Sequence, residues 1–360
     1  MRIGQYDSWN ERDNISAVLQ NYEKVINLAH SSSMPNEPND CWRFAKDSLI
    51  EFGCSPAQAE QLMSLTKDIR ELSECKNLDP NVHVLRAFLG RCAYRARLHL
   101  QNQLAYHPAV EEGIKSGIII IGPDELGLTD EQHKALEREL STPNGALSKN
   151  VSNMVALYPN QFPVSNLLLS MLTPILSQIS GYSQQTITDQ LRQTSFAQRV
   201  VNGPEDNDVQ KIMHQDTWFD AWKLWYFPRS VLRGEGPFRY APYSHGLSYA
   251  RLKLMKEFAT HDKKWEAWRS FGHDEGSWRV SDDELMSLGA APWPWRRQWP
   301  ARELNDEVIS DTGVAAYDIE ATAGTVVIAN VYGYHARGLA NETRERISLH
   351  ASIRPNPWTI

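Results

Sequence analysis

Several features that would assign this chain to a common class of protein are scarce or missing in its 360 residues. The net charge of −7 argues against a nucleic-acid partner, because such partners require a concentrated basic surface. The longest apolar stretch, residues 167–179, is interrupted by Pro174 and is too short to span a bilayer, so we expect no membrane span. The sequence also lacks a Gly-x-Ser-x-Gly elbow and a glycine-rich phosphate loop, and it therefore shows no protein nucleophile.

Cysteine is also scarce. The chain has four, and their spacing matches no zinc motif: Cys41, Cys54, Cys75 and Cys92. We interpret them as reduced thiols, which are typical of a reducing compartment. The first seven residues contain no apolar signal core. We therefore expect a cytoplasmic protein, and the sequence gives no indication of its oligomeric state.

What the chain does contain is a His-x-Asp triplet formed by His214 and Asp216. With 11 histidines and 44 acidic residues, about one His-x-Asp or His-x-Glu is expected by chance, and a second triplet at residues 273–275 lies in a polar, glycine-flanked segment typical of a loop. The first triplet precedes an aromatic, β-favouring run at residues 218–231. On an extended segment His214 and Asp216 point the same way, about 6 to 7 Å apart, so both can bind one cation.

A second histidine extends this constellation. Residues 324–329 are dense in β-branched side chains and predict a buried strand, and His335 follows after a short aromatic stretch. Two histidines and one carboxylate on one face of a site form the facial triad that holds non-haem Fe(II). His335 is therefore our candidate for a third metal ligand beside His214 and Asp216.

Residues 346–353 alternate polar and apolar side chains without a break, which predicts a half-buried strand. Its polar face carries Arg346, Ser348, His350 and Ser352. Because arginine offers two charged hydrogen bonds to a carboxylate and a nearby hydroxyl adds a third, Arg346 and Ser348 are candidates to bind a dicarboxylate. Lys223 is a second candidate partner for a carboxylate. The alternative is an exposed polar face on which Arg346 is merely solvated.

Together these motifs resemble the phytanoyl-CoA dioxygenase family over about residues 114–360. The resemblance rests on the order of five segments: His214-x-Asp216, the Gly-Pro-Phe-x-Tyr-x-Pro-x-Ser-His run from Gly236 to His245, Gly324-Thr-Val-Val-Ile, His335 and Arg346. It implies an α+β protein built on a double-stranded β-helix, a cupin-like jelly-roll barrel, braced by helices.

The resemblance also implies a chemistry. His214, Asp216 and His335 would bind Fe(II), Arg346 with help from Ser348 would bind 2-oxoglutarate, and O2 would be the oxidant. The chain would then be a dioxygenase, an oxidoreductase that hydroxylates an unactivated carbon of a small molecule or glycoconjugate and releases succinate and CO2. Halogenation is not expected, because Asp216 fills the position that halogenating relatives leave to a halide.

Candidate substrate contacts in this reading are Trp218, Tyr240 and Arg337. Two other functions stay open. One is an oxygen-independent, metal-dependent isomerase or epimerase on a similar barrel, and the other is a non-catalytic binding protein that kept the fold.

One segment departs from the family's pattern. The chain has Pro242-Tyr-Ser-His245 where the family has Pro-Gly-Ser-His. Because Tyr243 has a Cβ that makes a positive φ costly, we expect an altered turn there. We expect His245 to be a structural histidine of this turn rather than a fourth metal ligand.

The remaining regions are assigned by local signals. Residues 1–112 predict a helical N-terminal region, in which the basic residues between 86 and 97 are expected to form a solvated helix face. The catalytic domain is expected at residues 113–360, opening with a strand at 117–121 and then a helix begun by a capping box of Thr129 and Gln132. Residues 144–205 are expected to supply two strands and helices.

The segment 258–312 is expected to be an insertion rich in tryptophan, with six of the twelve in the chain. Its rings would form either an aromatic lid over the active site or a satellite core packed against the barrel.

Overall fold

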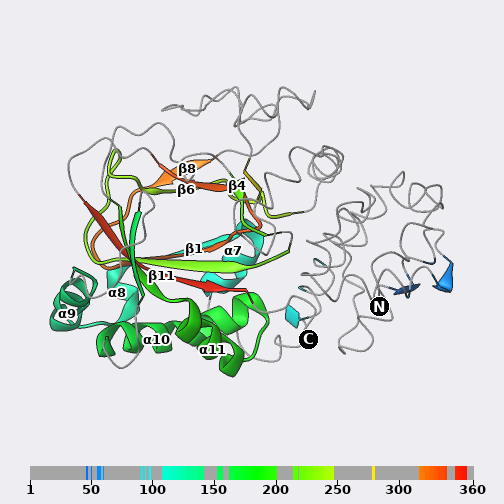
Figure 1. Ribbon diagram of the computed structural model, residues 1–360, viewed down its shortest axis with the longest axis horizontal. Coiled ribbons are helices and arrows are strands. Elements are labelled where there is room, and N and C mark those ends of the chain that lie inside the picture. The colour runs from blue at the N-terminus through cyan, green and yellow to red at the C-terminus, as the bar shows by residue number, and fades with distance from the viewer. Residues whose placement is uncertain are drawn as a thin grey trace.

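The computed structural model describes residues 46, 47, 50, 55–57, 60, 91, 94, 97, 98, 108–141, 152–156, 162–200, 214–217, 219–246, 278–279, 316–338 and 345–354. Antiparallel strands form two facing sheets, and helices cover the outer side of the larger one (Figure 1). The four cysteines, the triplet at 273–275, Trp218, most of residues 1–112 and the tryptophan-rich segment apart from residues 278–279 lie outside the described residues.

The larger sheet has six strands in the order β1-β9-β5-β11-β3-β2. Their bounds are Ile118–Ile121 for β1, Thr325–Asn330 for β9, Trp222–Phe227 for β5, Arg346–Ile353 for β11, Phe196–Val200 for β3 and Ser152–Ala156 for β2. The smaller sheet has five strands in the order β7-β4-β10-β6-β8. Their bounds are Trp278–Arg279 for β7, His214–Gln215 for β4, His335–Arg337 for β10, Phe238–Tyr240 for β6 and Tyr317–Ile319 for β8.

The order of these strands is that of a jelly roll. Strands β3, β5, β9 and β11 lie in the larger sheet, whereas β4, β6, β8 and β10 lie in the smaller one, so the chain repeatedly crosses between the sheets. Such an alternation is typical of double-sheet jelly rolls, a class that includes the cupins. The predicted combination of antiparallel sheets and helices is therefore confirmed, while closure of the two sheets into a barrel stays a prediction.

The described helices with named bounds are α7 (Pro108–Ser116), α8 (Pro123–Leu126), α9 (Asp130–Ser141), α10 (Pro163–Ser180) and α11 (Gln184–Thr194). The capping box is confirmed, because Thr129 N–H donates to Gln132 Oε1 over 2.8 Å and Gln132 N–H donates to Thr129 Oγ1 over 3.3 Å. The strand expected at 117–121 is β1. Residues 144–205 supply two strands, β2 and β3, with α10 and α11 between them, as expected.

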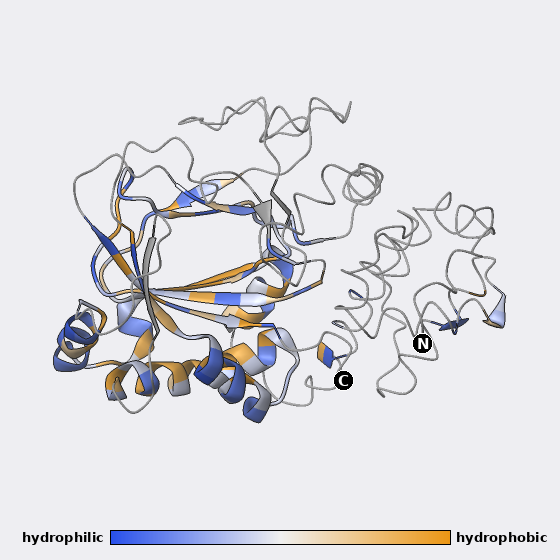
Figure 2. Cartoon of the chain, in the orientation of Figure 1, coloured by the Kyte–Doolittle hydropathy of each residue, from blue (hydrophilic) through white to orange (hydrophobic). Residues whose placement is uncertain are grey.

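Two apolar cores lie on opposite faces of the larger sheet. On the helix side, alternate residues of β11, Ile347, Leu349 and Ala351, pack in one buried cluster with residues of α10 and α11. On the side facing the smaller sheet, Trp225 of β5 packs on Phe238 of β6 with ring centroids 4.3 Å apart. Hydrophobic residues are concentrated on the strands and α10, whereas α9 and α11 are more hydrophilic (Figure 2). The interior between the sheets is thus lined by the second core.

The N-terminal region is described only at scattered residues, and four of them bury a helical face. Arg91, Tyr94, Arg97 and Leu98 are helical and buried. Tyr94 donates its hydroxyl to the carbonyl of Ile179 over 2.9 Å at the end of α10. The guanidinium of Arg97 lies 4.2 Å from the ring centroid of Tyr182. The expectation of a solvated basic face is wrong for Arg91 and Arg97, because an ion pair and an aromatic ring compensate for their burial.

The turn after β6 keeps the backbone that glycine would favour. Tyr243 has φ 66°, the one positive φ of a non-glycine residue in the described part of the chain. Its N–H donates to the carbonyl of Ser116 over 2.7 Å, and its ring is largely exposed. The expectation of an altered turn is thus wrong for the backbone at this residue. His245 is buried, with Nε2 3.1 Å from the carbonyl oxygen of Ile114, as expected for a structural histidine.

No helix in the described ranges is long and apolar enough to cross a membrane.

The contact between Arg97 and the end of α10 can be tested at Gly181. This glycine ends α10 with φ 75°, and a Cβ there would lie 2.5 Å from Arg97 Cβ and 2.8 Å from its backbone carbon. Gly127, which ends α8 with φ 64°, has nothing within 4 Å of such a Cβ. We expect Gly127→Ala to lower the free energy of unfolding by about 1 to 2 kcal/mol from backbone strain alone, and Gly181→Ala to lower it clearly further. Equal losses in urea denaturation would contradict this packing.

Candidate functional site

Strand β10 lies between β4 and β6 and brings the predicted ligands together. His335 is paired in register with His214 of β4 on one side and with Tyr240 of β6 on the other. Residues directly opposite in an antiparallel pair have Cα atoms about 4.5 to 5.5 Å apart. The two predicted histidines, 121 positions apart in the sequence, are therefore backbone neighbours in the smaller sheet. The side chain of His214 lies outside the described part of the structure.

Asp216 lies at the same end of the smaller sheet. Strand β4 ends at Gln215, so Asp216 occupies a bend and not the extended segment that the spacing argument assumed. Its N–H donates to the carbonyl of Val331 over 2.9 Å, which fixes the bend against the turn that follows β9. The carboxylate is buried, and its Oδ2 lies 3.6 Å from Nε2 of His335.

The ring of His335 is oriented by its other nitrogen. Nδ1 lies 3.0 Å from the carbonyl oxygen of Gly333, and because a carbonyl can only accept, Nδ1 carries the proton. Nε2, the other ring nitrogen, faces the Asp216 carboxylate. Histidines that bind metals typically have this second contact, which fixes the tautomer and the ring orientation.

The charge of Asp216 is set by a group of cations. Lys223 of β5 and Arg354 both contact Oδ2, the latter through Nη2 at 2.6 Å. Burial would raise the pKa of the Asp216 carboxyl, but Lys223, Arg354 and His335 together hold it well below its usual range. An ionised buried carboxylate beside an imidazole nitrogen is a donor set that fits a divalent cation. Such a cation would take over part of the neutralisation that Lys223 and Arg354 provide.

The sequence reasoning missed Arg354. It directly follows Ile353, the last residue of β11, and is two residues beyond Ser352, so the alternation that begins at Arg346 places it on the same side. Extending the alternation past Ile353 would have pointed to it. Lys223 was identified as a partner for a co-substrate carboxylate, and in this structure it contacts Asp216.

Among the side chains that the structure describes, no three His, Cys, Asp or Glu residues form a group that could hold a metal ion. Asp216 and His335 are two side chains of these types, and a third would have to come from a side chain outside that set.

Arg346 and Ser348 lie on the polar face of β11 and are buried, so the alternative of a solvated strand face is excluded for them. Arg346 donates from Nη1 to the carbonyl of Gly236 and from Nη2 to Gln198 Oε1 over 3.4 Å. Its Nε and the fully buried Oγ of Ser348 have no hydrogen-bond partner, and no described carboxylate pairs with Arg346. A buried cation without a counterion is costly, so this place favours an anion.

A second guanidinium reinforces the positive potential around Arg346. Burial lowers the pKa of Arg337, at the end of β10, to about 10. Burial, with a smaller contribution from Arg337, lowers the pKa of Arg346 to about 9. Both side chains therefore stay protonated near neutral pH.

His350 is the next inward-facing residue along β11. Its ring stacks on Phe196 with centroids 4.3 Å apart and meets the edge of Trp225 at 5.3 Å. Burial, and then the nearby charges of Lys223 and Arg354, lower the pKa of His350 well below its usual value. The imidazole is thus neutral, and its Nδ1 has no hydrogen-bond partner.

The structure describes two of the three candidate substrate contacts, Tyr240 and Arg337. Tyr240 is buried, and its hydroxyl donates to the carbonyl of Asn330 over 3.0 Å, so this hydroxyl already has an acceptor in the core. Arg337 is buried at the end of β10. Trp218 lies outside the described residues, and a substrate role stays a prediction for all three.

Comparison with known proteins gives a likeness only at the level of structure. No family model and no curated protein matches the sequence. Similar solved structures include the epimerase SnoN in complex with Fe3+, alpha ketoglutarate and nogalamycin RO, which is 13% identical with a TM-score of 0.41 over 69% of this chain and 85% of that one. HygX from Streptomyces hygroscopicus with nickel and 2-oxoglutarate is 10% identical, with a TM-score of 0.39 over 69% and 87%.

The carbocyclase SnoK from nogalamycin biosynthesis, described as non-heme and alpha ketoglutarate dependent, is 14% identical with a TM-score of 0.36 over 69% of this chain and 84% of that one. Likenesses of this size do not carry a function from one protein to another. The functional argument therefore rests on the residues of this chain.

The burial of His350 predicts a pH dependence of stability. An unfolded histidine has a pKa of about 6.5, and because the folded pKa is lower, the unfolded state binds the proton more tightly. This contribution to stability is fully present above about pH 6.5 and is lost as the pH falls below it. His350→Phe, which keeps a stacking ring, should therefore gain stability relative to the wild type by up to about 1.4 kcal/mol per pH unit below 6.5. Urea denaturation at pH 5 to 8 measures this, and a pH-independent difference would contradict a neutral buried His350.

Proposed function

We propose that this chain is an Fe(II)- and 2-oxoglutarate-dependent dioxygenase that hydroxylates an unactivated carbon of a small molecule or glycoconjugate, with release of succinate and CO2. The observation that carries the proposal is the pairing of two features in one interior. One is the buried Asp216–His335 pair, and the other is the buried guanidinium of Arg346 with no carboxylate partner among the described residues.

In this proposal Asp216 and His335 hold the metal together with His214, which is paired in register with His335. Asp216 contributes the negative charge, and His335 contributes a nitrogen whose direction is fixed by the carbonyl of Gly333. When bound, Fe(II) with the keto acid supplies the oxidising chemistry from O2.

Arg346 and Ser348 bind the distal carboxylate of 2-oxoglutarate in this proposal. The unpartnered Nε of Arg346 and the unpartnered Oγ of Ser348 offer donors that no described residue uses. Because the site is buried, charged hydrogen bonds formed there are not weakened by water. Lys223 is proposed as a second cation for the co-substrate, since its ammonium already lies at the Asp216 carboxylate.

The proposal is less detailed for the substrate-binding residues and for the domain bounds. We propose Trp218, Tyr240 and Arg337 as residues near the substrate, and residues 113–360 as the catalytic domain with 258–312 as an insertion.

The co-substrate site is tested with Arg346→Met. We expect the affinity for 2-oxoglutarate, measured by calorimetry on the Mn(II)-loaded protein, to fall by about 10- to 150-fold, because charged hydrogen bonds contribute about 1.5 to 3 kcal/mol each. Metal affinity should stay close to that of the wild type. Arg138→Met, on the exposed side of α9, is the matched control and should change neither affinity. An unchanged 2-oxoglutarate affinity in Arg346→Met would exclude this guanidinium as the carboxylate site.

The reaction itself is tested by succinate formation. With Fe(II), 2-oxoglutarate and a panel of metabolites, the wild type should form succinate only in the presence of O2, and His335→Ala should reduce this to background because a metal ligand is lost. An absorption band on anaerobic addition of Fe(II) and 2-oxoglutarate would establish binding of both. Product formation under strict anaerobiosis would select the isomerase or epimerase instead, and no Fe(II) binding would select the binding protein.

A further inference from the structure

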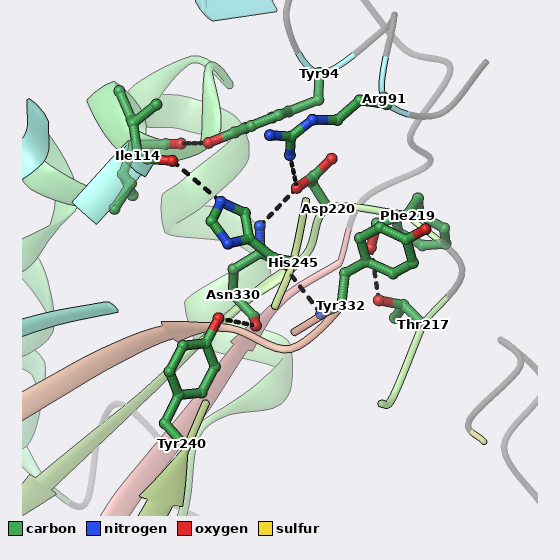
Figure 3. A network of polar contacts seen from close by, with 11 residues as sticks. Arg91, Tyr94, Ile114, Thr217, Phe219, Asp220, Tyr240, His245, Asn330 and Tyr332 are labelled. Carbon is green, nitrogen blue, oxygen red and sulfur yellow. Dashed lines mark hydrogen bonds and ion pairs between the residues drawn. The ribbon is translucent and has the colours of Figure 1, made fainter. Parts of the chain in front are cut away.

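A buried polar chain joins the N-terminal region to the turn between β9 and β10 (Figure 3). Arg91 donates from Nη1 to Asp220 Oδ1 over 2.6 Å, and Asn330 donates from Nδ2 to the same oxygen over 2.7 Å. The side chain of Asp220 has no exposed surface, and that of Arg91 is 10% exposed. Asn330, the last residue of β9, is fully buried. These buried hydrogen bonds therefore connect Arg91 of the N-terminal region with Asn330 at the end of β9.

Asn330, held by its hydrogen bond to Asp220, also forms the hydrogen bonds that hold the turn after β9. Its Oδ1 accepts the N–H of Tyr332 over 3.1 Å, and its carbonyl accepts the N–H of Gly333 over 2.9 Å. The same carbonyl accepts the hydroxyl of Tyr240. Gly333 has no space for a side chain, because a Cβ there would lie 2.2 Å from the Tyr240 hydroxyl. The turn formed by residues 330–333 is thus held by its first residue and packed tightly at its last.

Hydrogen bonds from this turn reach Asp216 and His335, the two proposed metal ligands whose side chains the structure describes. The carbonyl of Val331 accepts the N–H of Asp216 over 2.9 Å. The carbonyl of Gly333 lies 3.0 Å from Nδ1 of His335. A displacement of the turn would therefore move the Asp216 bend and rotate the His335 ring at the same time.

We propose that Arg91, Asp220 and Asn330 are positioning residues of the metal site, which act through the turn 330–333 on Asp216 and His335. The inference rests on the proposed function in that it requires a metal to be bound there. Replacing a buried ion pair by apolar residues of the same volume is often neutral or stabilising, so stability alone does not account for this pair. In this proposal the N-terminal segment that carries Arg91 helps to fix the geometry of the metal site.

The experiment uses the full chain and Co(II), whose affinity is measured by calorimetry and whose visible spectrum reports ligand geometry. Asn330→Asp keeps the shape of the side chain and the acceptor for Tyr332, but it places a second carboxylate against Asp220 at pH 8. We expect Co(II) affinity to fall by about 10- to 100-fold, as is typical when a residue that orients a metal ligand is changed, with a shifted spectrum. The double variant Asn330→Asp/Asp220→Asn removes the repulsion and should recover part of the affinity.

The role of Arg91, the cation of this hydrogen-bonded group, is tested in parallel. Arg91→Met should lower Co(II) affinity, and Arg91→Lys, which keeps the charge, should lower it less. Lys115→Met, which breaks the exposed pair of Lys115 with Glu111 in α7, is the control and should leave affinity and spectrum unchanged. Circular dichroism at the temperature of the titration confirms that each variant is folded.

Each outcome decides the question. A folded Asn330→Asp or Arg91→Met variant with wild-type Co(II) affinity and spectrum would overturn the positioning role while leaving the proposed function intact. Should the wild type itself fail to bind Co(II), the proposed function falls, and this inference falls with it.

Discussion

The alternation of side chains along β11 is the constraint on which the rest of this structure depends. One set, Ile347, Leu349, Ala351 and Ile353, is buried against the helices. Because successive side chains of a strand point to opposite faces, burial of this set directs the intervening residues into the space between the sheets. A shift of register by one residue would exchange the two sets and place a guanidinium against α10 and α11. The helix-side core thereby fixes the chemistry of the opposite face.

Among the described residues, that opposite face carries more cationic than anionic side chains. Lys223 and Arg354 converge on the single carboxylate of Asp216, while Arg346 and Arg337 raise the potential further along the same interior. In a region of low dielectric these charges favour small anions strongly over neutral molecules. A dicarboxylate therefore matches this interior better than a sugar or a fatty chain alone. A neutral substrate would have to bind beside the dicarboxylate and would not replace it.

The parts of the fold that could be predicted from the sequence have local signals. The capping box of Thr129 and Gln132, the β-branched run of β9 and the alternation of β11 each involve neighbouring residues, and each element formed at the expected place. The prediction of a half-buried strand is wrong for β11, which is buried on both faces because the second sheet covers its polar side. The strand order, by contrast, is not contained in any single pattern of the sequence.

Apart from Arg354, the missed features depend on distant residues. Arg91 and Asp220 are 129 positions apart, so no periodicity in either segment indicates that they form a buried pair. The bend at Asp216 depends on the carbonyl of Val331, and the positive φ of Tyr243 is accompanied by a bond to the carbonyl of Ser116. A pattern that describes one segment cannot contain a partner supplied by another.

The position of β11 in the larger sheet also has a consequence for biosynthesis. It follows every other described strand in the sequence, yet it lies between β5 and β3, near the middle of the sheet. Until the ribosome has released residues 346–353, both of these neighbours present an unpaired edge, which is a template for association with other chains. The strand that supplies Arg346 is therefore also the one whose insertion ends the period in which the nascent protein is most exposed to aggregation.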